Sequence, residues 1–269
     1  MGVQGRIDPT AKVHASAIID EGATIGANCD IGPLCTVGPD VKLGDGVVLK
    51  SHVVVTGDTE IGDETIVFPF SVIGEIPQDL KFSGEDTKLV IGKRNRIREH
   101  VTMNTGTAGG GYVTRVGDDG LFMAGCHVAH DAQIGDNVIL VNNVAVAGHV
   151  VIEDDVIVGG LSGIHQWVRI GRGAIIGALS MVTADVLPYA LVQGPRAELD
   201  GLNLVGLKRR GVARSDITAL RAAFLTLKQG EGSFQDRAKR LSEETDSTFV
   251  REMVGFVMGE SDRGFLTPK

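Results

Sequence analysis

The chain of 269 residues carries 34 acidic and 26 basic side chains, which gives a formal net charge of −8 at pH 7. This balance argues against a general nucleic-acid-binding protein, because such a protein presents a basic surface. The sequence contains no apolar run long enough to cross a bilayer and begins without the apolar core of a signal peptide, so we expect a cytoplasmic protein with no membrane insertion.

The N-terminal part of the chain has an aliphatic residue at every sixth position. These positions are Ile7, Val13, Ile19, Ile25, Ile31, Val37, Leu43, Leu49, Val55, Ile61, Val67 and Ile73. A period of six fits neither an α-helix nor a two-faced strand, so the repeat itself must be the structural unit. It predicts a β-helix in which three six-residue edges close a triangular turn of about 18 residues, and residues 18 apart stack in adjacent turns.

The repeat lapses over residues 74–90, where polar residues including Gln78, Asp79 and Lys81 replace it. Ile91 lies 18 residues after Ile73, so the prism continues and the segment is an inserted loop. Long excursions from a compact fold are commonly functional, and a mobile surface flap is the alternative.

After three further hexads, a glycine-rich insert lies within residues 104–115. It lacks the Lys-Ser/Thr pair of a phosphate-binding loop, and we expect a flexible loop. Twelve more hexads then run from Val116 to Val182, which brings the prediction to nine turns over residues 1–187. Cys29, Cys35 and Cys126 fall on the small inner position of a hexad, so we expect them to be buried and unreactive.

Residues 188–269 change to a helical pattern and predict a small C-terminal α-helical domain. The expected helices cover residues 203–210, 215–227 with Ser215 as N-cap, 233–244 with Ser233 as N-cap, and 247–258. Covering the last turn of the β-helix is the simplest role for this domain. A basic cluster at residues 208–214 suits a phosphorylated or acidic partner, or is an ordinary solvated helix end.

Four of the seven histidines cluster when residues 18 apart are stacked. The set on neighbouring turns is His127, His130, Asp131, Gly148, His149, His165 and Gln166. A histidine beside a carboxylate can act as a general base, and a glycine N–H one turn away can stabilise an oxyanion. Direct transfer is favoured, because no Ser or Cys is paired with the cluster. The alternatives are exposed polar residues without a common role, or a Zn²⁺ site.

Five segments together resemble one family. They are IGEIPQDLKFSGE at 73–85, IGKRNRIREHVTMNTGT at 91–107, HVAHDAQIGDNVILVNNVAVAGHV at 127–150, GGLSGIHQWVRIG at 159–171 and NLVGLKRRG at 203–211. The chain resembles the acyl carrier protein-dependent UDP-N-acetylglucosamine O-acyltransferases of lipid A biosynthesis over essentially its whole length.

The resemblance implies a mainly β protein, a left-handed parallel β-helix with a C-terminal α-helical domain, that forms a homotrimer with active sites between neighbouring prisms. It implies transfer of a (R)-3-hydroxyacyl chain from acyl carrier protein to the 3-position of UDP-N-acetylglucosamine, the first step of lipid A biosynthesis. No metal or diffusible cofactor is expected, since phosphopantetheine arrives on the carrier protein.

By position, the resemblance implies a role for each site residue. His130 matches the catalytic base, Asp131 its orienting partner and Gly148 the oxyanion donor. The residues that resemble substrate contacts are Gln78, Asp79, Lys81, His127, His149, His165 and Gln166, with Asn203, Arg209 and Arg210 at the nucleotide diphosphate and Ala178 and Met181 at the floor of the acyl channel.

Three departures from the family pattern concern substrate choice. Asn104 and Thr105 stand where a His-Arg pair is expected, which makes the 3-amino group of a UDP-3-amino sugar the alternative acceptor. Val205 replaces a Glu at the nucleoside end. Ala178 replaces a Gly and predicts a shorter acyl chain.

Other functions stay open at this point. The sister N-acyltransferase of the pathway normally carries a separate N-terminal uridine-binding domain. A metal-dependent hydratase of the hexapeptide-repeat carbonic anhydrase type would place two ligands five residues apart, whereas His127 and His130 are three apart. A trimeric scaffold without catalysis is the remaining alternative.

Overall fold

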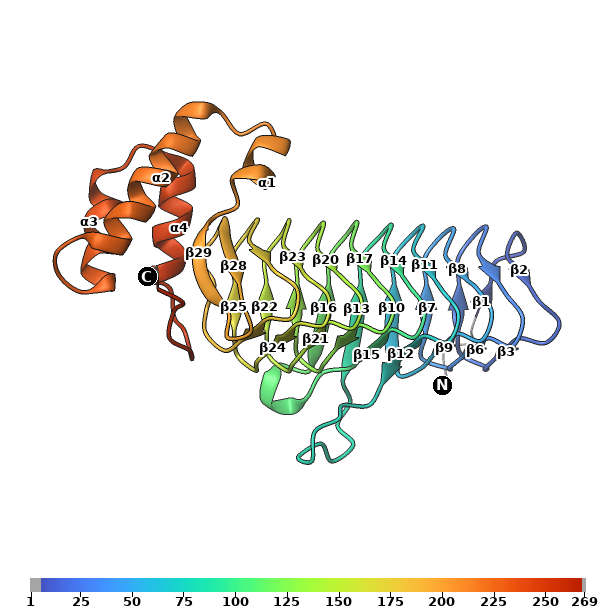
Figure 1. Cartoon of the computed structure of the whole chain (residues 1–269). Helices are drawn as coiled ribbons and strands as arrows, with labels where there is room; N and C mark the ends of the chain where they lie inside the picture. Colours follow the sequence, from blue (N-terminus) through green and yellow to red (C-terminus); the bar gives the residue numbers. More distant parts are fainter. Residues whose placement is uncertain (1–5, 268–269) are drawn as a thin grey trace.

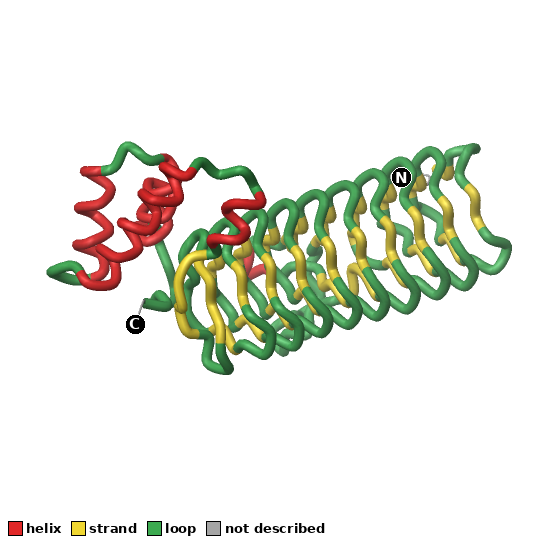
Figure 2. The backbone as a smooth tube through the Cα atoms, turned by 45° about the horizontal axis from the view of Figure 1, so that its top comes forward, coloured by secondary structure: helices red, strands yellow, loops and turns green. Residues whose placement is uncertain are grey.

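The computed structural model describes residues 6–267, in which a long prism of short parallel strands carries four helices at its C-terminal end (Figure 1). Each turn of the prism contributes one strand to each of three faces (Figure 2). Most strands are two residues long, because the chain bends at a corner after every six residues.

Within residues 6–267 the prism strands form three sheets. The first sheet contains β1 (Arg6–Ile7), β4 (Thr24–Ile25), β7 (Lys42–Leu43), β10 (Asp58–Ile61), β13 (Lys88–Ile91), β16 (Val113–Val116), β19 (Gln133–Ile134), β22 (Val151–Ile152) and β25 (Arg169–Ile170). The second contains β2 (Lys12–Val13), β5 (Asp30–Ile31), β8 (Val48–Leu49), β11 (Ile66–Val67), β14 (Arg96–Ile97), β17 (Leu121–Phe122), β20 (Ile139–Leu140), β23 (Ile157–Val158), β26 (Ile175–Ile176), β28 (Ala190–Gln193) and β29 (Glu198–Leu202). The third contains β3 (Ile18–Ile19), β6 (Thr36–Val37), β9 (Val54–Val55), β12 (Val72–Glu75), β15 (Thr102–Asn104), β18 (His127–Val128), β21 (Ala145–Val146), β24 (Gly163–Ile164) and β27 (Met181–Val182).

The strand register confirms the stacking of hexads. His127 pairs with Ala145, and Ala145 pairs with Gly163, each 18 residues on. The inner aliphatic residues from Ile25 to Val182 are buried and form one continuous core. The three cysteines are buried and unpaired, and burial raises the pKa of the Cys126 thiol to about 11, so this thiol is unreactive at neutral pH.

The two ends of the prism differ. At the N-terminal end the inward residues Ile7 and Val13 are 48% and 38% exposed, because no described turn covers them. At the other end β28 continues the second sheet and β29 turns back antiparallel, so the change from sheet to helix falls at Asn203, later than residue 187. No helix in the described part of the chain is long and apolar enough to cross a bilayer.

The C-terminal helices are α1 (Leu204–Arg209), α2 (Arg214–Gln229), α3 (Phe234–Glu244) and α4 (Thr248–Met258). Ser233 is the N-cap of α3 as predicted and forms a capping box with Asp236, but the N-cap prediction for Ser215 is wrong, because α2 begins at Arg214 after an extended Ala213. Helix α4 is attached to the prism through Glu252, which accepts from Arg172 Nε at 2.7 Å.

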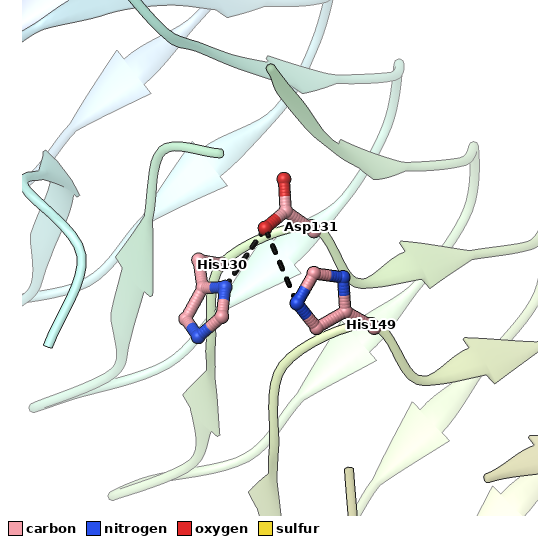
Figure 3. Close-up of side chains that lie close together, drawn as sticks. All are labelled: His130, Asp131 and His149. Atoms are coloured by element: carbon pink, nitrogen blue, oxygen red, sulfur yellow. Dashed lines mark hydrogen bonds and ion pairs between the residues drawn. The ribbon is translucent and has the colours of Figure 1, made fainter. Parts of the chain in front are cut away.

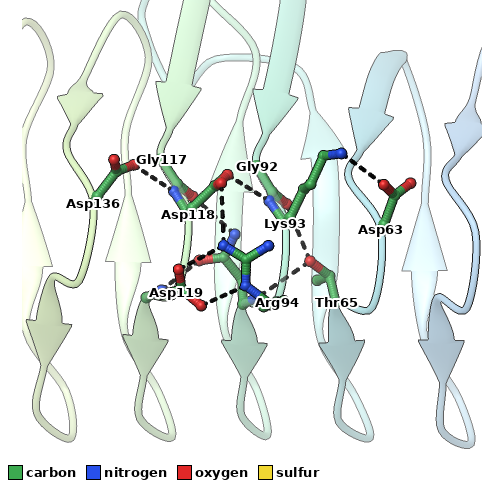
Figure 4. Close-up of polar contacts among 11 residues, drawn as sticks. Asp63, Thr65, Gly92, Lys93, Arg94, Gly117, Asp118, Asp119 and Asp136 are labelled. Carbon is green, nitrogen blue, oxygen red and sulfur yellow. Dashed lines mark hydrogen bonds and ion pairs between the residues drawn. The ribbon is translucent and has the colours of Figure 1, made fainter.

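Aspartates at one corner connect successive turns from outside (Figure 4). The N–H of Lys93 donates to Asp118 Oδ1 at 2.8 Å, and the N–H of Asp118 donates to Asp136 Oδ1 at 2.7 Å. The residue before each aspartate must be small, since a Cβ on Gly117 would lie 2.3 Å from Asp136 Oδ1. These bonds satisfy backbone donors that the corner takes out of the sheet ladder.

Candidate active site

His130 and Asp131 form a buried hydrogen-bonded pair just after β18 (Figure 3). His130 Nδ1 lies 2.8 Å from Asp131 Oδ2, and the two residues are 5% and 3% exposed. A carboxylate can only accept, so the imidazole proton sits on Nδ1 and the lone pair on Nε2 is free. This is the arrangement of a general base held by an orienting carboxylate.

Asp131 is held from three further directions. Its N–H donates to Thr114 Oγ1 at 2.7 Å. Thr107 donates its N–H to Asp131 Oδ1 at 2.8 Å and its hydroxyl to Oδ2 at 2.6 Å. Together with His130, these contacts fix the position and orientation of the carboxylate.

The glycine-rich insert packs directly on this carboxylate. It contains a short 3₁₀ turn, η1 (Ala108–Gly110), and a Cβ on Gly110 would lie 2.0 Å from Asp131 Cγ. The prediction of a flexible loop is therefore wrong, because the insert is tied to the prism through Thr107. Only glycine allows the chain to approach the carboxylate this closely.

Gly148 lies against the imidazole of His130. A Cβ on Gly148 would be 2.5 Å from His130 Cε1 and 2.6 Å from Nε2, so the two residues are neighbours on successive turns as the stacking predicts. Among residues 6–267, none accepts a hydrogen bond from the Gly148 N–H. An unpaired amide beside a base fits a donor to a developing oxyanion.

A groove of about 480 Å³ runs over the outer face of the third sheet beside this pair. It is lined by Gln78, His127, Ala129, His130, Ala145, Val146, Ala147, Gly148, Gly163, Ile164, His165, Gln166 and Met181. Ala145 and Gly163 occupy the strand positions between His127 and Met181, so the floor is shallow and apolar. The groove suits an extended hydrocarbon chain whose reactive end lies at His130.

His149 faces a second cavity, of about 490 Å³, on the other side of the Asp131 corner. Its ring stacks on Trp167 with centroids 3.8 Å apart and planes 2° apart, and it meets the His130 ring edge-on at 5.0 Å. Burial lowers the pKa of His149 against the smaller opposing effect of the Asp131 charge. Burial also lowers the pKa of His127, whose Nδ1 lies 2.8 Å from Thr102 Oγ1.

His130, Asp131 and His149 bring three potential metal ligand atoms within 4.8 Å of one another. Asp131 Oδ2 is already engaged by the Nδ1–H of His130 and by a threonine hydroxyl, while His149 Nε2 is 3.8 Å from it. A metal ion would have to replace both of these hydrogen bonds. The donor set therefore fits a proton-transfer pair better than a metal centre.

Several residues expected at the site lie outside the groove. Asp79 and Lys81 belong to the projecting loop 76–87, where the Lys81 N–H donates to Asp79 Oδ1 at 3.1 Å. Asn203 is buried, caps α1 by accepting from the Gly206 N–H and donates to the carbonyl of Gly173.

Three other residues expected at the site are exposed. Arg209 and Arg210 lie at the end of α1, and Ala178 lies at a corner shortly before Met181. Asn104, in place of the expected histidine, is buried and donates to the carbonyls of Glu75 and Ile76 at the base of the loop, and it does not line the groove.

The hexad prism, with a histidine–carboxylate pair beside an apolar groove, defines a hexapeptide-repeat transferase. A bacterial transferase hexapeptide family model matches residues 23–57, and one described as UDP N-acetylglucosamine O-acyltransferase, domain 2, matches residues 185–266. The chain is 66% identical over 203 residues to the acyl-(acyl-carrier-protein)–UDP-N-acetylglucosamine O-acyltransferase of Paracoccus denitrificans, covering 76% of this chain and 77% of that one. The chain belongs to this O-acyltransferase family.

Other relatives match this chain over almost its full length. The Rhizobium etli enzyme of the same name is 46% identical, with 97% of each chain covered. The solved UDP-N-acetylglucosamine acyltransferase from Campylobacter jejuni superposes with a TM-score of 0.90 at 40% identity, covering 96% of this chain and 100% of that one. The predicted fold, a left-handed parallel β-helix with a C-terminal helical domain, is confirmed.

Thr107 gives a direct test of how the glycine-rich loop supports the pair. Thr107→Val removes the hydroxyl bond to the buried Asp131 carboxylate and should lower the free energy of unfolding by about 1.5 to 3 kcal/mol. Thr107→Ser keeps the hydroxyl and should lose little. Thr218→Val, on the exposed face of α2, is the control. Equal unfolding midpoints for wild type and Thr107→Val would contradict the anchoring role.

Proposed function

We propose that this protein transfers a (R)-3-hydroxyacyl chain from acyl carrier protein to the 3-hydroxyl of UDP-N-acetylglucosamine, the first step of lipid A biosynthesis. The observation that carries the proposal is the His130–Asp131 pair and the unpaired Gly148 amide at one end of an apolar groove. The relatives named above support the donor and the acceptor.

In the proposed mechanism His130 Nε2 removes the proton of the sugar hydroxyl, which attacks the thioester carbonyl. The N–H of Gly148 stabilises the tetrahedral oxyanion, and the imidazolium then protonates the leaving thiol. Asp131 holds the ring and stabilises its positive charge. The phosphopantetheine arm comes with the carrier protein, so the proposal requires no metal and no diffusible cofactor.

In this proposal one part of the groove binds the acyl chain and another part binds the sugar. The acyl chain extends over Ala145 and Gly163 toward Met181, where apolar atoms dominate the surface. Gln78, His127, His165 and Gln166 then contact the sugar and the head of the acyl chain, with Asp79, Lys81 and His149 at its border.

The diphosphate is assigned to Arg209 and Arg210, which are exposed residues at the end of α1 and whose guanidinium groups suit phosphate oxygens. Asn203 supports them by capping α1, since both ends of its amide are engaged within the chain. The neighbouring basic residues Lys208 and Arg214 suit the acidic carrier protein.

His130 is the residue on which the mechanism depends most. His130→Ala should lower kcat by at least about 10²-fold, because the variant lacks the proton acceptor. Transfer is measured by mass spectrometry with UDP-N-acetylglucosamine and with its 3-amino analogue as acceptors. His14→Ala, an exposed histidine near the N-terminal end, serves as control. Turnover like that of wild type in His130→Ala would remove the base assignment.

We also propose that the protein is a homotrimer whose groove is completed by a neighbouring prism. One corner of the prism carries a discontinuous stripe of exposed apolar side chains along the prism axis, and the stripe reaches the groove at Leu161 and Leu179. Its members are Leu34, Phe70, Leu161 and Leu179, each 51–63% exposed. Apolar surface concentrated at one corner supports an interface with a second copy of the chain.

The trimer proposal predicts that a charge in the stripe breaks the assembly. Phe70→Glu should lower the molecular mass in solution from that of a trimer toward that of a monomer, because burying a carboxylate in an interface is unfavourable. The rate of acyl transfer should fall with it. Light scattering measures the mass. Leu225→Glu places the same charge on an exposed leucine of α2, outside the stripe, and should stay trimeric. A wild-type protein of one chain would contradict the proposal.

Ala178 is proposed to limit acyl length, because its methyl group lies at the corner that leads to Met181. Ala178→Gly should raise the rate with a fourteen-carbon donor relative to a ten-carbon donor by about tenfold, the scale of discrimination by a few groups in an apolar pocket. Ala124→Gly changes the same corner three turns earlier and should leave the ratio unchanged. An unchanged ratio in Ala178→Gly would overturn the assignment.

A further inference from the structure

The last residues of the described chain return from α4 to the prism. Residues 259–266 form a looped tail beside the end of the prism, with bends at residues 259, 262 and 263 (Figure 1). The Asp185 N–H donates to the Gly264 carbonyl at 2.8 Å, and the Leu266 N–H donates to the Asp185 carbonyl at 2.9 Å. The tail is therefore bonded to the segment that follows β27, close to the groove.

Asp185 is itself firmly held, which makes it a rigid anchor. Its buried carboxylate accepts from Arg169 Nε at 2.7 Å and from the Ser261 hydroxyl at 2.7 Å. The Arg169 guanidinium lies over the ring of Phe256 in α4, 4.4 Å from its centroid. These contacts keep the tail attached without help from the side chain of Arg263.

Arg263 extends from this tail to two residues of the groove. Its Nε donates to the Gln166 carbonyl at 2.9 Å, and its Nη2 lies 2.7 Å from His165 Nδ1. Both His165 and Gln166 line the groove. Residues almost a hundred positions apart in sequence are thus joined by one guanidinium group.

The contact between the Arg263 guanidinium and His165 Nδ1 determines the tautomer of His165. A guanidinium has donors only, so His165 Nδ1 must accept and the ring proton must sit on Nε2. His165 Nδ1 also lies 3.2 Å from the Gln166 carbonyl, which could accept from the opposite tautomer. A proton on Nδ1 would face the Nη2–H donor of Arg263 at 2.7 Å, so the opposite tautomer is disfavoured.

We propose that Arg263 is a positioning residue for the transfer reaction, holding His165 as an Nε2–H donor to an oxygen of the substrate in the groove. This inference rests on the proposed function. The ligand oxygen belongs to the acyl thioester or to the acceptor sugar, both of which present carbonyl and hydroxyl acceptors. Lysine would not replace Arg263 fully, because the two bonds need the planar fork of the guanidinium.

The test compares R263M, R263K and a matched control, R251M. Arg251 in α4 is exposed and its guanidinium donates to the Asp246 carbonyl at 2.8 Å, so R251M removes an arginine–carbonyl bond away from the groove. Histidines labelled with ¹⁵N report the tautomer, and the His165 signals are assigned by their loss in H165Q. Unfolding midpoints confirm that each variant is folded.

We expect the ¹⁵N shifts of wild type and R251M to show His165 Nδ1 unprotonated. In R263M the ¹⁵N shifts of both His165 ring nitrogens should move toward the averaged values of a ring that exchanges between its two tautomers. R263M should lose about 10- to 100-fold in kcat, the scale of a mispositioned contact group, and R263K should recover part of it. In the H165Q background R263M should change kcat less than about twofold, since the two residues act as one unit.

An unchanged His165 tautomer in R263M overturns the proposal, and so does a kcat within twofold of wild type. A wild-type protein that transfers no acyl chain to either sugar would contradict the proposed function. In that case the ¹⁵N signals still decide whether Arg263 sets the tautomer, so the two failures are distinguishable.

Discussion

The structure depends on the backbone pairing of each turn with the next in fixed register. Every strand of the first and third sheets pairs in parallel with the strand one turn away, and almost every inner residue is therefore covered above and below by another inner residue. Parallel pairing of this kind gives no freedom to slip, because a shift of one residue would turn the aliphatic side chains outward. The prism is rigid for that reason, and a rigid wall is what a precisely placed base requires.

The corners are where this regular wall becomes chemically useful. Asp131, His149 and Trp167 occupy the same corner in three successive turns, with φ of 60°, 59° and 67°. The left-handed conformation costs a side chain other than glycine about 1 kcal/mol, and it is tolerated where the stacked turns leave no alternative. It directs these three side chains away from the sheet, so that the Asp131 carboxylate meets the His130 ring and the His149 ring stacks on Trp167.

The period of the sequence determines which parts of this arrangement could be predicted. His130 and Gly148 are 18 residues apart, and their contact followed from counting alone. Thr107 lies in the glycine-rich insert and Arg263 in the C-terminal tail, where no repeat relates the chain to the prism. The contact of Thr107 with Asp131 and that of Arg263 with His165 could therefore be found only from the structure. The prediction that the glycine-rich insert is flexible was wrong for the same reason. Its glycine content indicates a backbone with many accessible conformations, but it does not indicate that the loop packs against the Asp131 carboxylate. The sequence predicts Asn203 as a substrate contact and does not show that it also caps α1, because short polar side chains serve both purposes.

The hydrogen bond to Asp131 distinguishes His130 from the other clustered histidines, and burial acts on the two rings beside it. The pKa of His127 is lowered mainly by burial and further by the neighbouring His130, and that of His149 is lowered by burial. In the folded protein both rings therefore bind protons less readily than in the unfolded chain, so they do not oppose folding at neutral pH and oppose it increasingly as the pH falls below the ordinary histidine range. A positive charge on His149, whose Nε2 lies 3.8 Å from Asp131 Oδ2, would compete with His130 for the carboxylate. The lowered pKa of His149 favours its neutral form and so leaves the Asp131 carboxylate to His130, as the proposed proton transfer from the acceptor to the leaving thiol requires.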